Sequence, residues 1–169
     1  MRILGIDPGS RRTGWGVVDE ISGTLKLVDC GLVNAVGPGA DASSFSARLA
    51  FIYRELTKLI AMYAPEVSAI EQVFTAQNAQ SALKLGQARG IAVAACAAYG
   101  LPVYDYEPTL VKKSLVGAGR AEKTQVAFMV KRLLNIRAAD WPLDATDALG
   151  VAICHLSQAR FATLASRCA

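Results

Sequence analysis

The chain has 169 residues, of which 53% are hydrophobic and 19% charged, and this composition excludes a disordered or highly charged protein in favour of one folded domain with a sizeable core. The net charge of +4 is unevenly placed, because residues 112–137 hold seven basic residues and one acid, whereas the rest of the chain holds eleven basic and thirteen acidic residues. Such a concentration is typical of a nucleic-acid-binding surface, although two solvated amphipathic helices would give the same pattern.

The N-terminal part of the chain predicts an antiparallel meander of three strands, over residues 2–6, 14–18 and 25–33. The first apolar run ends in Asp-Pro-Gly-Ser, and Ser-Gly forms a turn between the second and third strands. Residues 34–46 are rich in Gly, Ala, Ser and Pro and are predicted to form a surface loop. Apolar residues at helical spacing then predict a helix over 45–62.

The remainder of the chain predicts alternating strands and helices. Strands are expected over 67–70 and 101–106, and helices over 78–98, 107–116, 121–135 and 142–160. A short tail, 159–169, is expected to follow. Three strands followed by this alternation predict an α/β fold in one domain, 1–169, with a mixed five-stranded sheet covered by helices.

Small residues recur at every fourth position of the predicted helix 78–98. They are Ala82, Gly86, Gly90, Ala94 and Ala98. Residues four apart share one helix face, and small side chains there permit another backbone to approach closely. We expect this face to pack on the protein's own sheet, and the alternative is a contact between two copies of the chain.

The cysteines and the single histidine do not indicate a zinc site. Cys30, Cys96, Cys154 and Cys168 are scattered without a CxxC pair, and His155 directly follows one of them. Reduced, mostly buried thiols in a cytoplasmic protein are expected. The start of the chain lacks a signal-peptide cleavage region, and the most apolar stretch is far too short to span a membrane.

Four acidic residues stand where a site is expected. Asp7 and Glu71 each close an apolar strand, and ligands in α/β sheets gather beyond the carboxyl ends of strands. Asp144 and Asp147 are three residues apart, near the start of a helix whose beginning is indicated by Pro142. Residues at this spacing share one helix face. For Asp144 an interaction with the helix dipole is an alternative, whereas Asp147 borders apolar residues where an unpaired carboxylate is costly.

Carboxylates grouped in this way fit the hydrolysis of a phosphodiester bond. That reaction needs an activated water, a stabilised transition state and a neutralised leaving oxygen, which two Mg²⁺ ions supply together. Magnesium requires oxygen ligands. We therefore expect the four acids to hold two divalent cations beside a nucleic-acid phosphate.

Five motifs, in order, resemble the RuvC family of crossover junction endodeoxyribonucleases over residues 2–158. They are ILGIDPGS at 3–10 followed by TGWG at 13–16, AIEQVF at 69–74, SALKLGQARG at 81–90, the basic segment from 111 to 123, and DATDAL at 144–149. The opening Asp-x-Gly alone is shared by many RNase H-like proteins, and the ordered set is far more specific.

The resemblance implies an RNase H-like fold and a homodimer that binds a four-way Holliday junction and cuts two strands symmetrically, in recombination and DNA repair. The implied cofactor is Mg²⁺, with Mn²⁺ as a substitute and two ions in each subunit. The implied partners, besides junction DNA, are a hexameric branch-migration motor and its junction-binding protein.

The resemblance also assigns roles to single residues. Asp7, Glu71, Asp144 and Asp147 take the catalytic, metal-ligand positions. Phe74 falls where the family places an aromatic residue near the crossover, with an ordinary core phenylalanine as the alternative. Lys112 and Lys123 fall at basic positions associated with phosphate contact and catalysis. Further DNA contacts are expected from Arg89, Lys113 and Arg120.

Three alternatives remain open at this point. A phosphotransferase that uses ATP shares the opening Asp-Pro-Gly turn, but such enzymes need two domains around the nucleotide. A non-catalytic junction-binding protein would be expected to lack at least one of the carboxylates. Another RNase H-like nuclease would keep them all and cut linear DNA as well.

Overall fold

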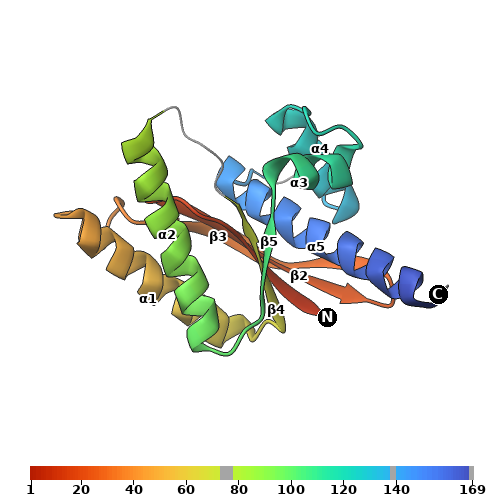
Figure 1. Ribbon diagram of the computed structural model, residues 1–169, viewed down its shortest axis with the longest axis horizontal. Helices are drawn as coiled ribbons and strands as arrows, with labels where there is room; N and C mark the ends of the chain where they lie inside the picture. Colours follow the sequence, from red (N-terminus) through yellow and green to blue (C-terminus); the bar gives the residue numbers. More distant parts are fainter. Residues whose placement is uncertain (73–77, 138–139, 168–169) are drawn as a thin grey trace.

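The computed structural model describes residues 1–72, 78–137 and 140–167, and these form a five-stranded sheet with helices on both faces (Figure 1). The strands are β1 (Arg2–Asp7), β2 (Arg12–Ile21), β3 (Thr24–Asn34), β4 (Val67–Glu71) and β5 (Val103–Tyr106). The helices are α1 (Phe45–Tyr63), α2 (Ala79–Ala98), α3 (Pro108–Val116), α4 (Lys123–Leu133) and α5 (Leu143–Arg167).

The strand order is β3-β2-β1-β4-β5, with β1 at the centre. The first three strands are antiparallel neighbours, whereas β1, β4 and β5 run parallel. Ser22 and Gly23 both have positive φ, of 49° and 84°, and close the predicted tight turn between β2 and β3. The predicted mixed five-stranded α/β sheet is therefore confirmed.

Alternation along β1 separates two hydrophobic cores. Ile3 packs in the core under α3, α4 and α5, whereas Leu4 and Ile6 pack in the core under α1 and α2. Successive side chains of a strand point to opposite faces, so Gly5 and Asp7 lie on the α5 face with Ile3. The strand pattern thus directs Asp7 towards α5.

Capping residues explain where the helices begin. The Ser44 side chain accepts a hydrogen bond from the backbone N–H of Ala47, 3.0 Å away, at the start of α1. Glu122 and Gln125 form a reciprocal capping box at the start of α4. Among the described residues, no helix is both long and apolar enough to cross a membrane.

Two sequence predictions are wrong. Helix α5 continues to Arg167 rather than ending at 160, and Arg160, the last residue of the predicted helix, bonds to the β2–β3 hairpin. Its Nη2 donates to Glu20 Oε1 at 2.9 Å and to the Gly23 carbonyl at 2.8 Å. These hydrogen bonds join residues that are far apart in the sequence, so no local sequence pattern indicates them.

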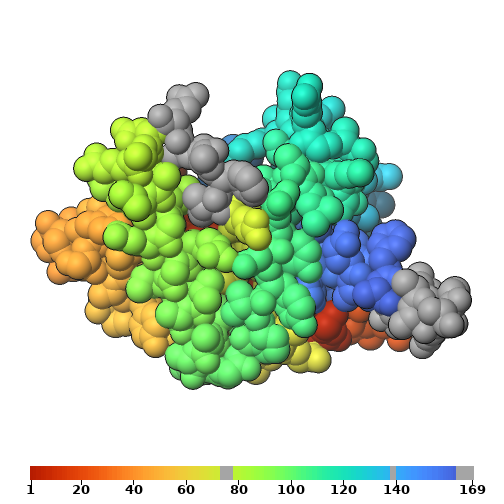
Figure 2. All heavy atoms as spheres, viewed as in Figure 1, coloured from red at the N-terminus to blue at the C-terminus, as the bar shows by residue number. Residues whose placement is uncertain are grey.

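The small-residue face of α2 is the second correction, because it does not pack on the protein's own sheet. Gly86, Gly90, Ala94 and Ala98 are exposed, and a Cβ at either glycine would meet nothing within 4 Å. The residues that α2 buries against the sheet and α1 are instead Ala88, Ala92, Ala95 and Cys96. In Figure 2, α2 lies along the near surface of the molecule.

Candidate active site

Asp7 and Glu71 lie side by side at the carboxyl ends of two neighbouring parallel strands. Ile6 of β1 is paired with Ile70 of β4, so the next residue of each strand is an acid at the same edge of the sheet. A side-chain hydrogen bond joins the two carboxyl groups. The two strands are neighbours, which is the condition on which the prediction of a shared site depends.

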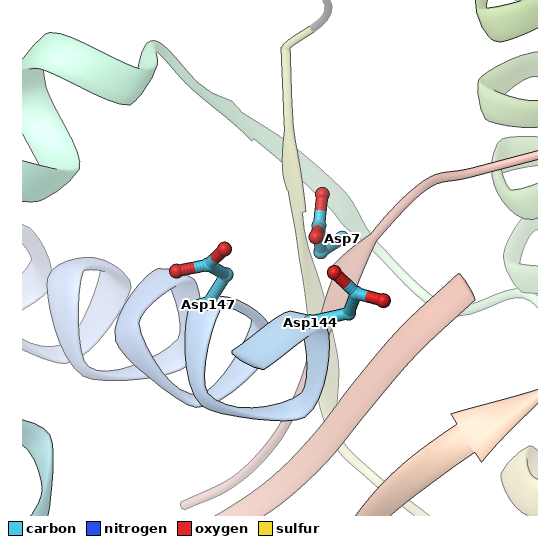
Figure 3. A group of neighbouring side chains, drawn as sticks. All are labelled: Asp7, Asp144 and Asp147. Atoms are coloured by element: carbon cyan, nitrogen blue, oxygen red, sulfur yellow. The ribbon is translucent and has the colours of Figure 1, made fainter. Parts of the chain in front are cut away.

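Asp144 and Asp147 project from the first turns of α5 and complete the cluster. Carboxylate oxygens of Asp7, Asp144 and Asp147 all lie within 4.8 Å of one another, and all three residues are partly buried. Figure 3 shows the three side chains grouped beside the start of α5. Glu71 stands outside this trio but contacts it through Asp7.

Glycines on the sheet allow α5 to come this close. A Cβ on Gly14 would overlap the carbonyl oxygen of Asp144, and a Cβ on Gly5 would overlap that of Ala148. Gly14 is the residue of β2 paired with Asp7. The helix backbone therefore rests directly on the sheet beside Asp7, which brings its two aspartates into the cluster.

Crowding changes the acidity of the central carboxyl. Burial, followed by the charges of Glu71, Asp147 and Asp144, raises the pKa of Asp7 from 3.8 to about 8. Burial and the charge of Asp147 also raise the pKa of Glu71. Burial and mutual repulsion therefore disfavour the ionised form of Asp7 in the folded site.

These residues fit a divalent cation. Every donor is a hard carboxylate oxygen, the kind of ligand that Mg²⁺ and Mn²⁺ take, and the donors come from three separate elements of a rigid framework. A bound cation would also remove the repulsion that raises the pKa of Asp7. The arrangement of Asp7, Asp144 and Asp147 therefore suits a divalent cation, and the ligand roles of the four acids stay a prediction.

Two lysines border the carboxylates. A cavity of about 180 Å³ beside the cluster is lined by Glu71, Pro108, Val111, Lys112, Lys123, Val126 and Asp147. Lys123 Nζ donates to Asp147 Oδ2 at 2.7 Å, and this hydrogen bond raises the pKa of the lysine. The lysines predicted for phosphate contact thus stand beside the carboxylate cluster, from α3 and α4.

The other predicted DNA contacts differ in their surroundings. Lys113 on α3 and Arg120 between α3 and α4 are exposed. Arg89 on α2 donates from Nη2 to Asp105 Oδ1 at 2.6 Å, across to the edge strand β5. Phe74 lies outside the described residues. A role in DNA binding stays a prediction for all four residues.

The glycines that allow α5 to pack closely on the sheet beside the site were not identified from the sequence. Gly5, Gly14 and Gly16 all face α5, and a Cβ on Gly16 would crowd the Leu149 side chain. Glycines two apart inside a predicted strand signal close approach of another backbone, so the sequence held this information. The pairing of Lys123 with Asp147 had no local signal, because the residues are 24 positions apart.

Sequence comparison places the chain among known proteins. The profile of the family "Crossover junction endodeoxyribonuclease RuvC" matches residues 3–155. The chain is 59% identical to the crossover junction endodeoxyribonuclease RuvC of Oleidesulfovibrio alaskensis over 164 residues, which cover 97% of this chain and 95% of that protein. It is 54% identical to the RuvC protein of Lawsonia intracellularis over 167 residues, covering 99% and 96% of the two chains.

The fold is also similar to a solved structure. Thermus thermophilus RuvC in complex with Holliday junction substrate superposes with a TM-score of 0.85 at 34% identity, covering 96% of this chain and 97% of that one. The similarity extends over the sheet and its helices.

Proposed function

The chain belongs to the RuvC family of crossover junction endodeoxyribonucleases, and we propose that it resolves four-way Holliday junctions by symmetric, metal-dependent hydrolysis of phosphodiester bonds in two strands. Its fold is RNase H-like, as in the T. thermophilus protein. The activity serves homologous recombination and DNA repair, and its place is the bacterial cytoplasm, where chromosomal DNA lies.

The observation that carries this function is the carboxylate cluster with its lysine border. Three aspartates lie within 4.8 Å, Glu71 contacts Asp7, and two lysines line the adjoining cavity. Acidic groups alone would repel a phosphate, whereas acids that hold cations beside lysines attract one. This combination suits hydrolysis of a phosphate ester.

The cofactor that fits is Mg²⁺ or Mn²⁺, with two ions held by Asp7, Glu71, Asp144 and Asp147. When bound, such ions neutralise the scissile phosphate and lower the pKa of the attacking water. The four carboxylates would hold the ions between the strand ends and the start of α5. Asp7, between the sheet and the helix, touches both halves of the cluster.

The lysines bind and orient the phosphate. Lys112 lines the cavity from α3, and Lys123 reaches it from the first turn of α4. Lys123 also neutralises part of the charge of Asp147, so its ammonium group is already positioned at the site before DNA arrives. Both ammonium groups stabilise the additional negative charge of the transition state.

A homodimer is the assembly that explains paired cuts. Two symmetric subunits offer two identical sites, as two nicks in strands of like polarity require. The exposed small-residue face of α2 supports a contact there, because Gly86 and Gly90 leave open space and Leu83 beside them is 68% exposed. A branch-migration motor and its junction-binding protein complete the proposed set of partners.

Cleavage of a synthetic mobile four-way junction tests the function. Each strand is labelled in turn and incubated with the protein in Mg²⁺ or in EDTA, and a linear duplex of the same sequence is the control substrate. Asp7→Asn is the control protein. We expect paired symmetric nicks on the junction, only with metal and only with the unaltered chain.

Other results would change the conclusion. Equal cutting of the linear duplex would make the protein a general RNase H-like nuclease. Junction binding with no cutting in any metal would favour the non-catalytic alternative, and would contradict the assigned role of the four carboxylates.

A further inference from the structure

A second basic site lies at the far end of α4. A hollow of about 660 Å³ is lined by Phe128, Lys131, Arg132, Asn135, Ile136 and Arg137. Three of these six residues are cationic and none is acidic. Arg132 and Arg137 are exposed, and like charges that converge on one hollow favour an anionic ligand.

The turn after α4 holds these groups in a fixed arrangement. Asn135 has a left-handed backbone, with φ of 56°, and its N–H donates to the Arg132 carbonyl at 3.1 Å. The N–H of Ile136 donates to the Lys131 carbonyl at 2.8 Å, which closes the helix end. The lining residues therefore belong to a capped helix end rather than to a long loop.

This basic hollow is connected to the carboxylate site through α4 and the start of α5. At one end of α4, Lys123 pairs with Asp147. At the other end, Lys131 Nζ lies 6.0 Å from the ring centroid of Trp141, three residues before Asp144. The two ends of α4 are thus both anchored to the segment that carries the catalytic aspartates.

The spacing suits a DNA backbone. Lys123 and Arg132 are nine residues apart, which is ~13 Å along a helix. One strand of a duplex rises ~3.4 Å for each nucleotide, so this distance corresponds to about four nucleotides. A phosphate held by the lysines of the active site therefore leaves a later phosphate within reach of the basic hollow.

We propose that the basic hollow binds backbone phosphates of one duplex arm of the junction, about four nucleotides from the cleaved bond. The guanidinium groups of Arg132 and Arg137 each donate two hydrogen bonds to phosphate oxygens. The side-chain amide of Asn135 donates a hydrogen bond to a further phosphate oxygen. Phosphate contacts carry no sequence information, so the hollow sets the position of the arm and not the choice of cleavage sequence. The proposal rests on the proposed junction cleavage.

The test compares two double variants that each remove two exposed positive charges. Arg132→Gln/Arg137→Gln alters the basic hollow, and Arg54→Gln/Lys58→Gln alters α1 on the other side of the sheet. Junction affinity is measured in EDTA over a range of salt concentrations, with thermal melts to confirm folding. Phe128→Ala, which removes no charge, is a third variant.

We expect the variant of the basic hollow to lose affinity roughly tenfold for each lost contact at low salt, and its salt slope to fall by ~0.9 per contact. The α1 variant and Phe128→Ala should keep the wild-type slope. Replacing the third to fifth phosphates from the cut by neutral methylphosphonates should weaken junction binding by the wild-type chain. The same replacement should leave junction binding by the variant of the basic hollow unchanged.

Equal affinities and slopes for the two double variants, with a wild-type chain that binds and cuts junctions, would overturn the assignment of the basic hollow alone. Its chemistry would then suit an acidic protein segment. A wild-type chain that neither binds nor cuts junctions would overturn the proposed function and, with it, this inference. If methylphosphonates weakened junction binding equally in the wild-type chain and in the variant of the basic hollow, the assignment of the basic hollow would also be wrong.

Discussion

Glycines occur in two regions of this molecule with opposite surroundings. On the sheet, Gly5 and Gly14 lie beneath α5, where a side chain would collide with backbone oxygens of that helix. On α2, Gly86 and Gly90 face open space. The inner pair secures a close contact inside the chain that assembles the carboxylate site, whereas the outer pair leaves a smooth face for another molecule. The same residue type therefore marks both the active site and the proposed dimer contact.

Removing one of the assembled carboxylates should produce the largest effect. Asp7→Asn is expected to lower cleavage by at least ~10³-fold, because it removes a carboxylate that we propose as a central metal ligand. Junction binding in EDTA should stay the same at pH values below about 8, where the Asp7 carboxyl is mostly protonated, and should tighten at higher pH, where the substitution removes a negative charge facing phosphates. The metal-free variant should also melt at a higher temperature, because the raised pKa of Asp7 reflects repulsion and burial in the folded cluster.

Gel-shift affinity, cleavage rate and thermal melting check these three expectations. Weaker junction binding by Asp7→Asn would argue that Asp7 is structural. An unchanged melting temperature in EDTA would contradict the repulsion within the cluster.

Adding a methyl group to an inner glycine should displace the site without removing any ligand. Gly14→Ala would push its Cβ into the Asp144 carbonyl, so α5 must shift. A displacement of ~1 Å at reacting groups costs on the order of 100-fold in rate, and overpacking costs ~1–3 kcal/mol of stability. Cleavage rate and urea unfolding measure the two effects.

Gly90→Ala is the matched control for that substitution. It lies on an exposed helix surface, where replacing glycine by alanine should add ~0.5–1 kcal/mol to the stability of the monomer. If Gly14→Ala and Gly90→Ala changed the cleavage rate and the free energy of unfolding by similar amounts, the proposed difference between inner and outer glycines would be wrong.

A bulkier residue on the outer face should break the proposed dimer. Gly86→Leu places a large side chain where two α2 backbones would approach, so the protein should sediment as a monomer while its far-UV circular dichroism stays unchanged. Junction cleavage should then yield unpaired nicks. A Gly86→Leu variant that stays dimeric would move the dimer contact away from the small-residue face of α2.

The smallest effect concerns the buried histidine on α5, which contacts the tyrosines of β5. His155 Nδ1 lies 2.7 Å from the Tyr106 hydroxyl, and burial lowers its pKa below 6.5. The folded chain therefore resists protonation while the unfolded chain accepts a proton, so stability should fall as pH drops below about 6.5. His155→Gln should reduce the dependence of the free energy of unfolding on pH in this range, as measured by urea unfolding. If the dependence stayed the same, other groups would be its cause.

Local patterns in the sequence account for most of the secondary structure. A short apolar run ending in Asp-Pro-Gly-Ser predicted β1, and helical spacing predicted α1 to within one residue of its observed end. Asp7 and Glu71 were predicted to meet because each ends an apolar strand, and the parallel pairing of β1 with β4 satisfies that condition.

Orientation was predicted less well than position. The small-residue stripe of α2 was recognised, but it faces outward because Ala88, Ala92 and Ala95 form a second small face that packs inward. Both faces of this helix permit close packing, so periodicity alone does not decide between them. Arg89 was expected to contact DNA, and its pairing with Asp105 depends on how α2 crosses the edge strand.

The sequence by itself determined the α/β order of elements, the family and the identity of the four acids, because these depend on periodicity, on turn residues and on motifs read along the chain. Only the tertiary structure decided that three aspartates lie within 4.8 Å, that Lys123 pairs with Asp147, and that a second basic hollow lies at the end of α4. The aspartate cluster and the ion pair join residues far apart in the chain, and they depend on how closely α5 packs on the glycines of the sheet. The basic hollow is built from residues 128–137, which the turn after α4 brings together.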